Sequence, residues 1–481
     1  MNSWNRKSFG IKSLRNPERQ QAKIRVELTA KEGASRLQKT GAAIVIILLC
    51  AMPFVTSAPF AWIAFAVSPI FLVLIVLQLG AAFQTAPPEF KEHSGASLRV
   101  NWPVYTVLVP LYRETAIINQ LLNACRAIDY PPSCLEVLFL VEMDDTSTKN
   151  ALDNAELSPW MHVVVVPKGY PRTKPRALNH GLLRATGHYI TVYDAEDIPD
   201  ADQLKMAVQL FESSPPYIQC LQARLAIDNA PDSWFSLMMC IEYAALFDTI
   251  KCGLASANLP IALGGTSNHF RREDMLRLAG WDSFNVTEDA DLGIRIARQG
   301  GLVMDLPSST LEEAPIHFKG WLGQRRRWLK GWIQTGICHS REPRSAIRDL
   351  GLVNWLVVMV QIFGVVVGAL TFPFFASWFL WNLWIGSVWA SADLFVVMTN
   401  SVAIVIFFVG LLAMILPAII GLQRRRAWHL IPWLVMFPFY LLFVSMAAWL
   451  AVIDFIRQPF HWEKTTHGLG RRRPSAFKNK Q

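Results

Sequence analysis

The stretch Val104–Pro110 (VYTVLVP) begins the globular part of this 481-residue chain. Similar short runs of β-branched and apolar residues follow it at Glu136–Val141 (EVLFLV), Met161–Val166 (MHVVVV) and Tyr189–Tyr193 (YITVY). Between the first two runs, Glu114–Ile128 has helical spacing, and this alternation of strand and helix is typical of an α/β domain. We therefore predict a mixed, mostly parallel sheet within residues 100–315.

Apolar residues make up 52% of the chain and are concentrated at its two ends. Residues 41–84 are long enough for two spans of roughly 20 residues each, which predicts a transmembrane hairpin. Residues 348–456 are a second apolar region, in which we predict three spans between Leu352 and Gly421 and one span afterwards. The chain is thus predicted to cross a membrane about six times.

Residues 1–40 are polar and rich in Lys and Arg, without the apolar core and cleavage site of a signal peptide. Positive residues before a first span favour the cytoplasmic side, and a two-span hairpin returns the chain to that side. We expect a multi-pass protein of the inner (plasma) membrane with its middle domain in the cytoplasm. The seven cysteines have irregular spacing, which indicates reduced thiols and no zinc site.

The net charge of +9 is distributed in segments that flank the apolar regions. Examples are Arg325 to Lys330, Arg424 to Arg426 and Arg471 to Arg473. Anionic lipid headgroups explain this pattern more simply than DNA does. We therefore expect membrane lipids and no nucleic acid among the partners.

Carboxylates follow two of the predicted strands. Asp144 and Asp145 come after the second strand, and Asp194, Glu196 and Asp197 come after the fourth. Open α/β sheets bind ligands at the carboxyl ends of their strands, where such groups can face a nucleotide and a divalent metal. Turn formation and helix capping are the alternative role for each of these acids.

Two further segments have residue types suited to ligand binding. Lys174 precedes a helical segment, where its ammonium group could meet a pyrophosphate, and a solvated surface lysine is the alternative. Small residues at Gly264–Asn268, including Gly265, Thr266 and Ser267, allow a backbone to approach a ligand closely. An ordinary turn is equally compatible with this second segment.

Thr287-Glu288-Asp289 begins a predicted helix with Thr287 as its cap and acids in its first turn. Some 35 residues later, Gln324-Arg325-Arg326-Arg327-Trp328 lies in a basic, aromatic segment, and residues 316–347 are predicted to form interfacial amphipathic helices. A carboxylate base, guanidinium groups for a diphosphate and an indole for a sugar face together indicate glycosyl transfer. Helix initiation remains the alternative role for the acids.

The order of these motifs resembles membrane-integrated glycosyltransferases of family 2, which include cellulose, hyaluronan and chitin synthases and some glycolipid glucosyltransferases. The resemblance implies a nucleotide-sugar-binding domain of the GT-A type between transmembrane helices. It assigns the catalytic base to Asp289 and the metal to Asp194 and Glu196, where the family usually has a second Asp. It further implies donor binding by Asp144, Asp145, Lys174, Asp194, Gln324 and Arg327, and acceptor contacts by Gly265, Thr266, Ser267, Glu288 and Trp328.

Residues 457–481 contain Trp462-Glu463-Lys464-Thr465-Thr466-His467-Gly468, which is similar to the cytoplasmic gating loop of cellulose synthases. That loop has the pattern FxVTxKG. The resemblance adds Trp462, Thr465 and His467 to the residues expected near the acceptor, although Lys464 stands in place of Val and His467 in place of Lys.

These observations predict a metal-dependent inverting hexosyltransferase that uses Mg²⁺ or Mn²⁺ and a UDP-sugar, by default UDP-glucose. The expected product is a growing β-glycan, exported through the protein's own transmembrane region. The alternative is a glycolipid synthase that adds one or few sugars to a membrane lipid. A transporter with a cytoplasmic binding domain is disfavoured because the apolar segments are nearly free of ionisable groups.

Overall fold

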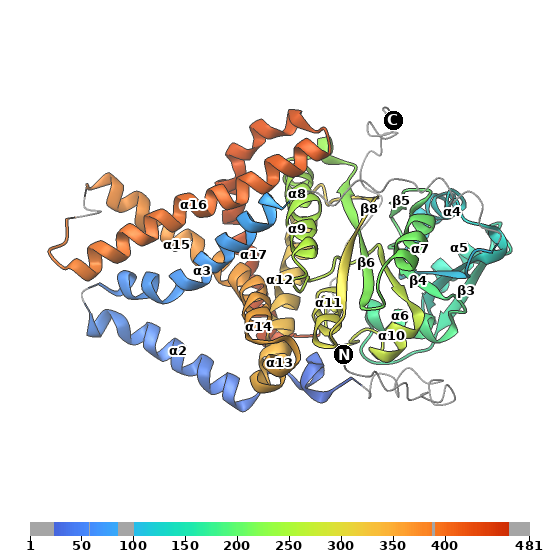
Figure 1. The fold of residues 1–481 in the computed structure, drawn as a ribbon, viewed down its shortest axis with the longest axis horizontal. Helices are drawn as coiled ribbons and strands as arrows, with labels where there is room; N and C mark the ends of the chain where they lie inside the picture. The colour runs from blue at the N-terminus through green and yellow to red at the C-terminus, as the bar shows by residue number, and fades with distance from the viewer. Residues whose placement is uncertain (1–23, 57, 85–100, 387–389, 461–481) are drawn as a thin grey trace.

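The computed structural model describes residues 24–56, 58–84, 101–386 and 390–460. The gating-loop-like residues Trp462, Thr465 and His467 lie outside these ranges, so their predicted role stays a prediction. The described chain forms a globular α/β part, with long apolar helices projecting from one side of it (Figure 1).

An eight-stranded sheet organises the globular part, with strand order β3-β2-β1-β4-β7-β6-β8-β5. Four of its seven pairings are parallel and three are antiparallel. The strands are β1 Tyr105–Leu111, β2 Leu135–Glu142, β3 Met161–Val166, β4 Tyr189–Val192, β5 Ile198–Pro199, β6 Ile218–Ile227, β7 Asn268–Arg271 and β8 Leu302–Glu312. The prediction of a mixed, mostly parallel sheet is confirmed, and β1 to β4 are the four predicted strands.

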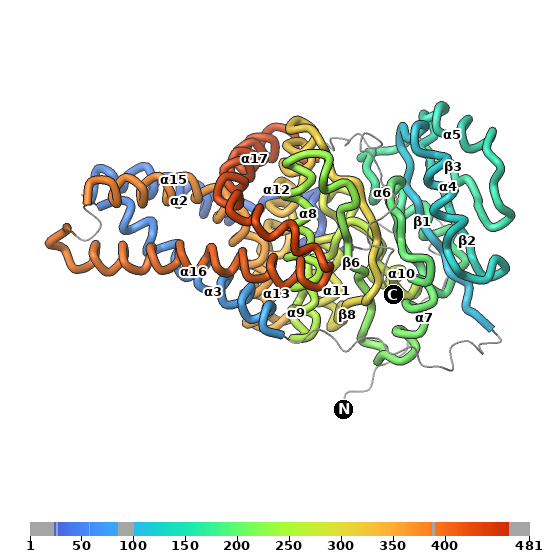
Figure 2. The backbone as a smooth tube through the Cα atoms, turned by 90° about the horizontal axis from the view of Figure 1, so that it is seen from above, coloured from blue at the N-terminus to red at the C-terminus, as the bar shows by residue number. Residues whose placement is uncertain are grey.

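Helices connect these strands and cover both faces of the sheet (Figures 1 and 2). They are α4 Ile118–Arg126, α5 Thr146–Asp153, α6 Lys174–Arg184, α7 Gln203–Ser213, α8 Trp234–Ala245, the π-helical turn η8 Leu246–Ile250, α9 Lys251–Ser256, α10 Arg272–Arg277 and α11 Glu288–Arg298. Short 3₁₀ turns lie at η5 Thr115–Ile117, η6 Pro132–Cys134 and η7 Ala230–Asp232. The predicted helix Glu114–Ile128 is therefore the turn η5 followed by α4.

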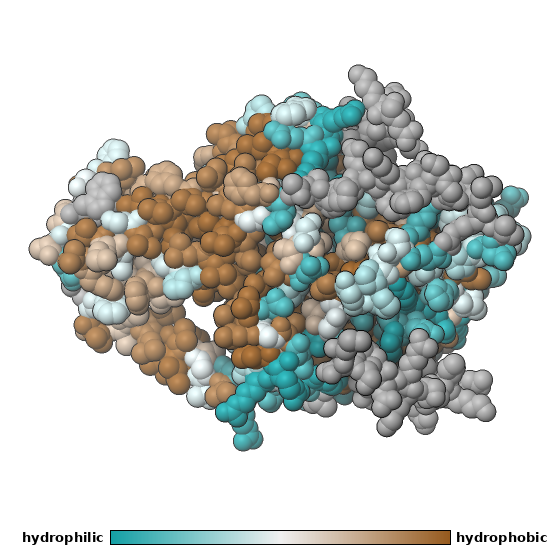
Figure 3. All heavy atoms as spheres, viewed as in Figure 1, coloured by the Kyte–Doolittle hydropathy of each residue, from teal (hydrophilic) through white to brown (hydrophobic). Residues whose placement is uncertain are grey.

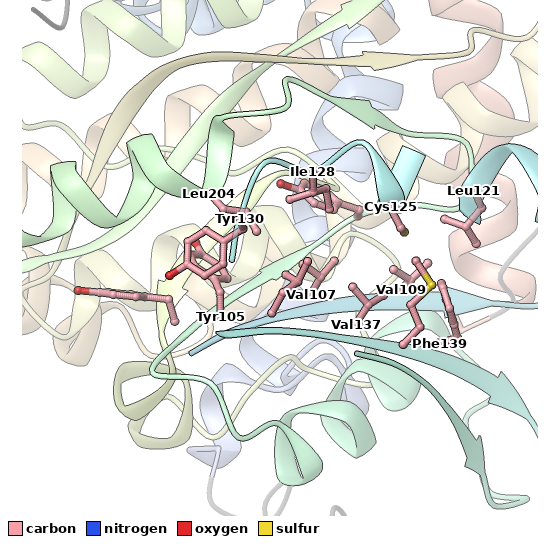
Figure 4. Packing of buried hydrophobic residues seen from close by; sticks show 14 of the residues in the cluster. Tyr105, Val107, Val109, Leu121, Cys125, Ile128, Tyr130, Val137, Phe139 and Leu204 are labelled. Carbon is pink, nitrogen blue, oxygen red and sulfur yellow. The ribbon is translucent and has the colours of Figure 1, made fainter. Parts of the chain in front are cut away.

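Strand β1 shows why the sheet is covered on both faces. Tyr105, Val107 and Val109 pack with Leu121 of α4 in one buried cluster, which Figure 4 shows from close by. Leu108, between them, packs in a second buried cluster on the opposite face. Because successive strand side chains point to opposite faces, a nearly continuous apolar run fits a strand buried on both sides.

Two helices after the sheet connect the globular part to the apolar helices. They are α12 Phe318–Ser340, which contains the predicted Gln324–Trp328 motif, and α13 Pro343–Leu350. The short 3₁₀ turns η2 Val26–Leu28 and η3 Ala30–Glu32 lie against them, where the Arg341 guanidinium donates to the backbone carbonyl of Gly33 (2.6 Å). The predicted helices within residues 316–347 are thus present.

Five helices are long and apolar enough to cross a membrane, judged by length and composition within the described residues. They are α2 Arg36–Val55, α3 Pro59–Phe83, the continuous helix Leu352–Trp384 (α14 Leu352–Met359, η9 Val360–Gly364, α15 Val365–Trp384), α16 Leu394–Arg424, and Trp428–Arg457 (η10 Trp428–Met436, α17 Phe437–Arg457). Hydrophobic side chains dominate the surface of this projecting bundle, whereas the globular part is mainly hydrophilic (Figure 3).

The predicted three spans between Leu352 and Gly421 are wrong for the described chain, because the structure has two long helices there, Leu352–Trp384 and Leu394–Arg424. A helix rises 1.5 Å per residue, so helices of 33 and 31 residues each extend to roughly 50 Å, well beyond a hydrocarbon core of about 30 Å. Pro373 and Pro417 lie inside these helices without ending them. Length alone therefore overcounted the spans.

Candidate active site

A cavity of about 470 Å³ lies at the carboxyl edge of the sheet, between the strand ends and helices α11 and α12. Leu111 of β1, Glu142 of β2 and Glu312 of β8 line it together with Asp194, which follows β4. Parallel strands bring residues from distant parts of the chain to this edge, as expected for an open α/β sheet. Most of the predicted site residues meet here.

Asp289 lies in the first turn of α11 and lines the cavity. Gly265 is beside it: a Cβ atom placed on this glycine would be 3.6 Å from the Asp289 carboxylate and 3.9 Å from the ammonium nitrogen of Lys174. Gly265 therefore lies next to both a carboxylate and a lysine. A Cβ atom at this position would be at ordinary van der Waals distance from both groups.

Lys174, at the start of α6, connects the acids of the cavity. Its Nζ lies 2.5 Å from Asp194 Oδ1 and donates to the backbone carbonyl of Gly265 at 2.8 Å. Burial alone would lower the pKa of Lys174, but the charges of Asp194, Glu288 and Asp289 raise it above its usual value. The lysine therefore stays cationic and compensates carboxylates from two separate segments.

Several other carboxylates in the cavity are close enough to repel one another. Burial, together with the neighbouring charges of Asp194 and Glu196, raises the pKa of Glu312 to about 8. Burial and the neighbouring charge of Asp289 raise the pKa of Glu288 to about 7. This part of the cavity has an excess of negative charge over what Lys174 compensates.

A divalent cation fits this excess of negative charge. Asp194 and Glu196 both line the cavity at the end of β4, and carboxylate oxygens are the ligands that Mg²⁺ and Mn²⁺ prefer. Within the described residues, no group of three His, Cys, Asp or Glu side chains is placed to hold a metal ion by itself. Oxygens from a bound ligand would therefore have to complete the coordination.

We predict that Mn²⁺ or Mg²⁺ with a nucleoside diphosphate raises the thermal unfolding temperature of the purified protein by a few degrees. A cation bound only by the folded state stabilises that state and relieves the repulsion around Glu312. Replacing Asp194 by Asn is expected to reduce the shift, whereas Asp153→Asn on α5 is the matched surface control. Equal shifts in K⁺ and in the divalent cations would contradict cation binding at this site.

Helix α12 brings Gln324, Arg327 and Trp328 to the cavity wall. The Arg327 guanidinium donates to the backbone carbonyl of Val286 at 3.4 Å, while its buried Nε has no hydrogen-bond partner among the described residues. Such an unsatisfied guanidinium group in a cavity is suited to an anionic ligand. The Trp328 ring stacks on Tyr243, with ring centroids 6.4 Å apart, so it combines a packing role with its place in the cavity.

Polar contacts hold α12 against the segment that precedes α11. Gln334 Oε1 accepts from the backbone N–H of Val286 at 3.1 Å, and Asn285 donates to the Thr335 hydroxyl at 2.9 Å. Gly331 faces Thr287 so closely that a Cβ atom there would overlap the threonine side chain. These contacts fix the spacing between Asp289 and the α12 residues.

Some predicted residues have structural roles outside the cavity lining. Asp145 caps α5, where its carboxylate accepts from the backbone N–H of Thr148 at 3.2 Å. Asp144 forms an ion pair with Arg172 at 2.7 Å, and only Arg172 of this pair lines the cavity. For Asp145, the observed role is therefore helix capping, which was the alternative to ligand binding.

Thr266 and Ser267 also lie behind the cavity wall rather than in it. The Thr266 hydroxyl donates to the backbone carbonyl of Val192 at 3.1 Å, and the Ser267 hydroxyl donates to Thr310 at 2.6 Å. Asp197 is likewise internal, with its carboxylate accepting from the backbone N–H of Asp194 at 2.7 Å. These residues support the strand ends on which Asp194 and Gly265 are placed.

The cavity lining also contains residues that were not predicted from the sequence, among them Tyr243, Lys251 and Glu312. Glu312 ends a strand that is buried on alternate residues, so a strand-end rule applied to β8 would have found it. Tyr243 and Lys251 lie on α8 and α9, whose apolar sequence has no motif that marks them. Only the three-dimensional arrangement identifies these two residues.

A family model described as glycosyltransferase like family 2 matches residues 103–331. A probable glycosyltransferase of Bacillus subtilis, YdaM, is 28% identical over 48% of this chain and 55% of its own length. A beta-monoglucosyldiacylglycerol synthase of Synechocystis is 25% identical over 62% of each chain. Glucomannan 4-beta-mannosyltransferase 2 of Arabidopsis thaliana is 23% identical over 52% of this chain and 47% of its own length.

The chain thus spans about half to three-fifths of the length of these curated relatives. Among solved structures, a mannosyltransferase of Pyrobaculum calidifontis in complex with GDP-mannose and Mn²⁺ is 19% identical. The match covers 81% of this chain and 99% of that one, with a TM-score of 0.44.

Proposed function

From residues 103–331, which form a domain of the glycosyltransferase family 2 type, we propose that this protein transfers a hexose from a UDP-sugar to an acceptor hydroxyl at a membrane surface. The resemblance to this family is confirmed by the domain match and by glycosyltransferase relatives. The observation that supports the specific reaction is one cavity holding Asp289, Lys174, Asp194 and the α12 residues.

Asp289 is the proposed general base. Its carboxylate takes the proton of the acceptor hydroxyl as that oxygen attacks the anomeric carbon of the donor. The new bond forms on the face opposite the bond to the diphosphate, which breaks and leaves with its electron pair as UDP. The product has inverted anomeric configuration, and the enzyme forms no covalent intermediate.

Charge that develops on the leaving diphosphate needs stabilisation from fixed positive groups. Arg327, whose buried Nε has no partner among the described residues, is placed to bind it, and Gln324 lies on the same helix. Asp194 and Glu196 would hold Mg²⁺ or Mn²⁺, which when bound neutralises diphosphate charge. Lys174 forms an ion pair with Asp194 and lies near the α11 acids, whose charges keep the lysine protonated.

The cavity also indicates the kind of acceptor. Leu74 and Leu77 of α3 and Val365 of α15 line it together with the polar residues of the domain. These side chains belong to helices long and apolar enough to span a membrane. A cavity shared by a catalytic domain and apolar helices suits an acceptor with a lipid chain, so we propose glycolipid synthesis as the function that the geometry supports best.

Polysaccharide synthesis with export through the apolar helices remains a second proposal. The gating-loop-like sequence around Thr465 and His467 favours it, and this segment follows α17, which ends beside α12. Trp381 and Trp384, aromatic residues of a kind that can line a sugar path, are exposed at the end of α15 and do not line the cavity. Their placement is typical of an interfacial belt.

We predict that the labelled product made by purified protein in native lipid extracts partitions into organic solvent. A lipid that carries one or few sugars still dissolves in organic solvent because of its apolar chains. A long glycan remains in the aqueous phase and elutes early from a size-exclusion column. Extraction followed by chromatography measures this directly. A long, glycosidase-sensitive aqueous product would replace the glycolipid proposal with the polysaccharide one.

The helix pair η10 and α17 begins and ends on the domain side of the bundle. At the end of the preceding helix α16, Arg425 Nε donates to Asp248 Oδ2 of the domain at 2.6 Å. At the far end of α17, Gln334 of α12 donates to the backbone carbonyl of Pro459 at 2.9 Å. Arg325 of α12 in turn forms an ion pair with Glu242 of α8 at 2.6 Å.

We propose that α17 lies in the plane of the membrane on the cytoplasmic side, so that the other four apolar helices cross it. Its exposed apolar side chains recur every three or four residues, at Phe439, Leu442, Met446, Trp449, Ile453 and Ile456. Such a stripe on one side of a helix, with α12 on the other, suits an interfacial helix. With this arrangement the chain would cross the membrane four times, and an even number of crossings returns the chain to its starting side.

Four crossings predict that green fluorescent protein fused after Gln481 is fluorescent, because it folds in the cytoplasm and not after export. Fusion after Gly386, between α15 and α16, is expected to be dark. Immunoblots of both fusions control for expression. A dark C-terminal fusion with a well-expressed chain would support a fifth crossing by α17.

A further inference from the structure

Lys251 is a buried cation in the cavity that the proposed reaction does not use. It is the first residue of α9, directly after the π-helical turn η8, and it is only 8% exposed. No hydrogen bond or ion pair joins its ammonium group to another residue in the described part of the chain, and its Nζ lies 4.3 Å from the ring centroid of Phe247. Burying an ammonium group that has no direct ion pair costs free energy, so a structural role alone explains it poorly.

The charge state of Lys251 suits a ligand-binding role. Burial lowers its pKa to about 8, although the nearby charges of Asp289 and Glu312 act to raise it. The side chain therefore remains largely protonated at neutral pH. A cation that lies within electrostatic reach of the proposed base can bind an anionic group close to the reacting hydroxyl.

Lys251 also lies where the domain meets a candidate membrane span. Gly253, two residues further along α9, packs so tightly on Ala81 of α3 that a Cβ atom there would overlap the Ala81 backbone. Ala81 is close to the end of α3, which ends at Phe83. The ends of membrane spans lie near the level of lipid headgroups, which is where the phosphates of phospholipids are found.

The cavity around Lys251 has both polar and apolar lining. The carboxylates of Asp289 and Glu312 are near the lysine, and apolar side chains from η8, α9, α3 and α15 also line the cavity. These apolar residues include Leu74, Leu77, Phe247, Ile250, Leu254 and Val365. A molecule that contacts both kinds of lining has an apolar chain, an anionic group at the lysine and a hydroxyl beyond it.

We propose that Lys251 binds the anionic group of a lipid acceptor, whose acyl or prenyl chain lies along the apolar lining and whose hydroxyl is directed to Asp289. The proposal rests on the proposed function. It names a substrate class, a lipid with a phosphate or carboxylate in its headgroup, and makes Lys251 a specificity-determining residue. A neutral lipid such as diacylglycerol leaves the lysine without its counter-ion.

The test compares two lipids with the same acyl chains, phosphatidylglycerol and diacylglycerol, as acceptors in mixed micelles with a labelled UDP-sugar. Both offer a primary hydroxyl, and only the first has a phosphate beside it. We expect the wild-type protein to prefer phosphatidylglycerol by at least about tenfold, which corresponds to 1.4 kcal/mol. Glycerol 1-phosphate, which lacks chains, is expected to be a poor acceptor, and efficient transfer to it would overturn the lipid part of the proposal.

Lys251→Met is expected to abolish the preference for the anionic lipid, and Lys251→Arg is expected to retain it. UDP affinity should remain unchanged in both variants, and Lys149→Met on the surface of α5 is the matched control. Loss of UDP affinity in Lys251→Met without a change in lipid preference would instead place the lysine at the donor diphosphate, and this result overturns the proposal.

Thermal unfolding of Lys251→Met without acceptor separates binding from folding. Because the substitution removes an unpaired buried charge, we expect an unfolding temperature equal to or above that of the wild type. A strongly destabilised variant would show that Lys251 is structural and would overturn the proposal. If no acceptor gives Asp289-dependent UDP release, the proposed function itself fails. If transfer depends on Asp289 but shows no preference for the anionic lipid, only the role of Lys251 fails.

Discussion

Replacing Asp289 by Asn is expected to lower kcat by about 10²- to 10⁴-fold while leaving UDP affinity largely unchanged. The amide has nearly the same shape as the carboxylate but cannot accept the acceptor's proton. Asp289 lines the cavity beside Gly265 and Lys174, so an isosteric change disturbs few contacts. Steady-state kinetics with calorimetric titration of UDP measures both quantities.

Two controls give this result its meaning. Asp291→Asn changes the next acid of the same helix. Asp291 lies outside the cavity lining, where it contacts Arg295 at 2.7 Å and His339 at 3.0 Å. This substitution is expected to lower the stability of the protein more than the rate of the chemical step. Asp153→Asn on the surface of α5 should change neither. Near wild-type turnover by Asp289→Asn would show that another group is the base.

Replacing Lys174 by Met is expected to cost about 10²- to 10³-fold in kcat/KM, comparable to removing a preorganised electrostatic group in other active sites. The ammonium group lies 2.5 Å from Asp194 Oδ1 and near Glu288 and Asp289. Without it, these carboxylates repel one another more strongly, and the pKa values of Glu288 and Glu312, which the charge of Lys174 lowers, rise. The acidic limb of the pH–rate profile should therefore move to higher pH.

This shift in the pH profile distinguishes an electrostatic role of Lys174 from simple loss of packing. Lys174→Arg keeps the charge and is expected to keep the position of the acidic limb, although its larger group fits the space beside Gly265 less well. A profile that stays unchanged in Lys174→Met, with the same loss of rate, would contradict the electrostatic role.

The sheet could be predicted from sequence because three of its first four strands, β1, β2 and β4, are buried on both faces. β1 and β2 are nearly continuous apolar runs, and their bounds differ from the predicted ones by a residue or two. The predicted span count failed for a different reason. Hydropathy records which residues avoid water, but it does not show whether an apolar stretch of about 70 residues is divided into two long helices or three shorter ones.

The site was predictable where a motif reflects local backbone geometry. Asp194 and Asp289 come to one cavity because the fold places the end of β4 and the start of α11 there, and α12 brings Arg327 to the same cavity. Asp145 shows the limit, since an acid after a strand can equally cap the next helix, and here it accepts from the backbone N–H of Thr148. Lys251 is a cavity residue that no sequence motif marks, because its place in the cavity depends on how α9 packs on α3.

UDP release from a panel of UDP-sugars, with Mg²⁺ or Mn²⁺ and native lipid extract, tests the central claim most directly. We predict that one donor supports release by the wild-type protein, that chelation of the cation abolishes it, and that Asp289→Asn reduces it by at least about 10²-fold. Release that is equal in the wild type and in Asp289→Asn, or absent with every donor, would contradict the assignment of this cavity as a glycosyl-transfer site.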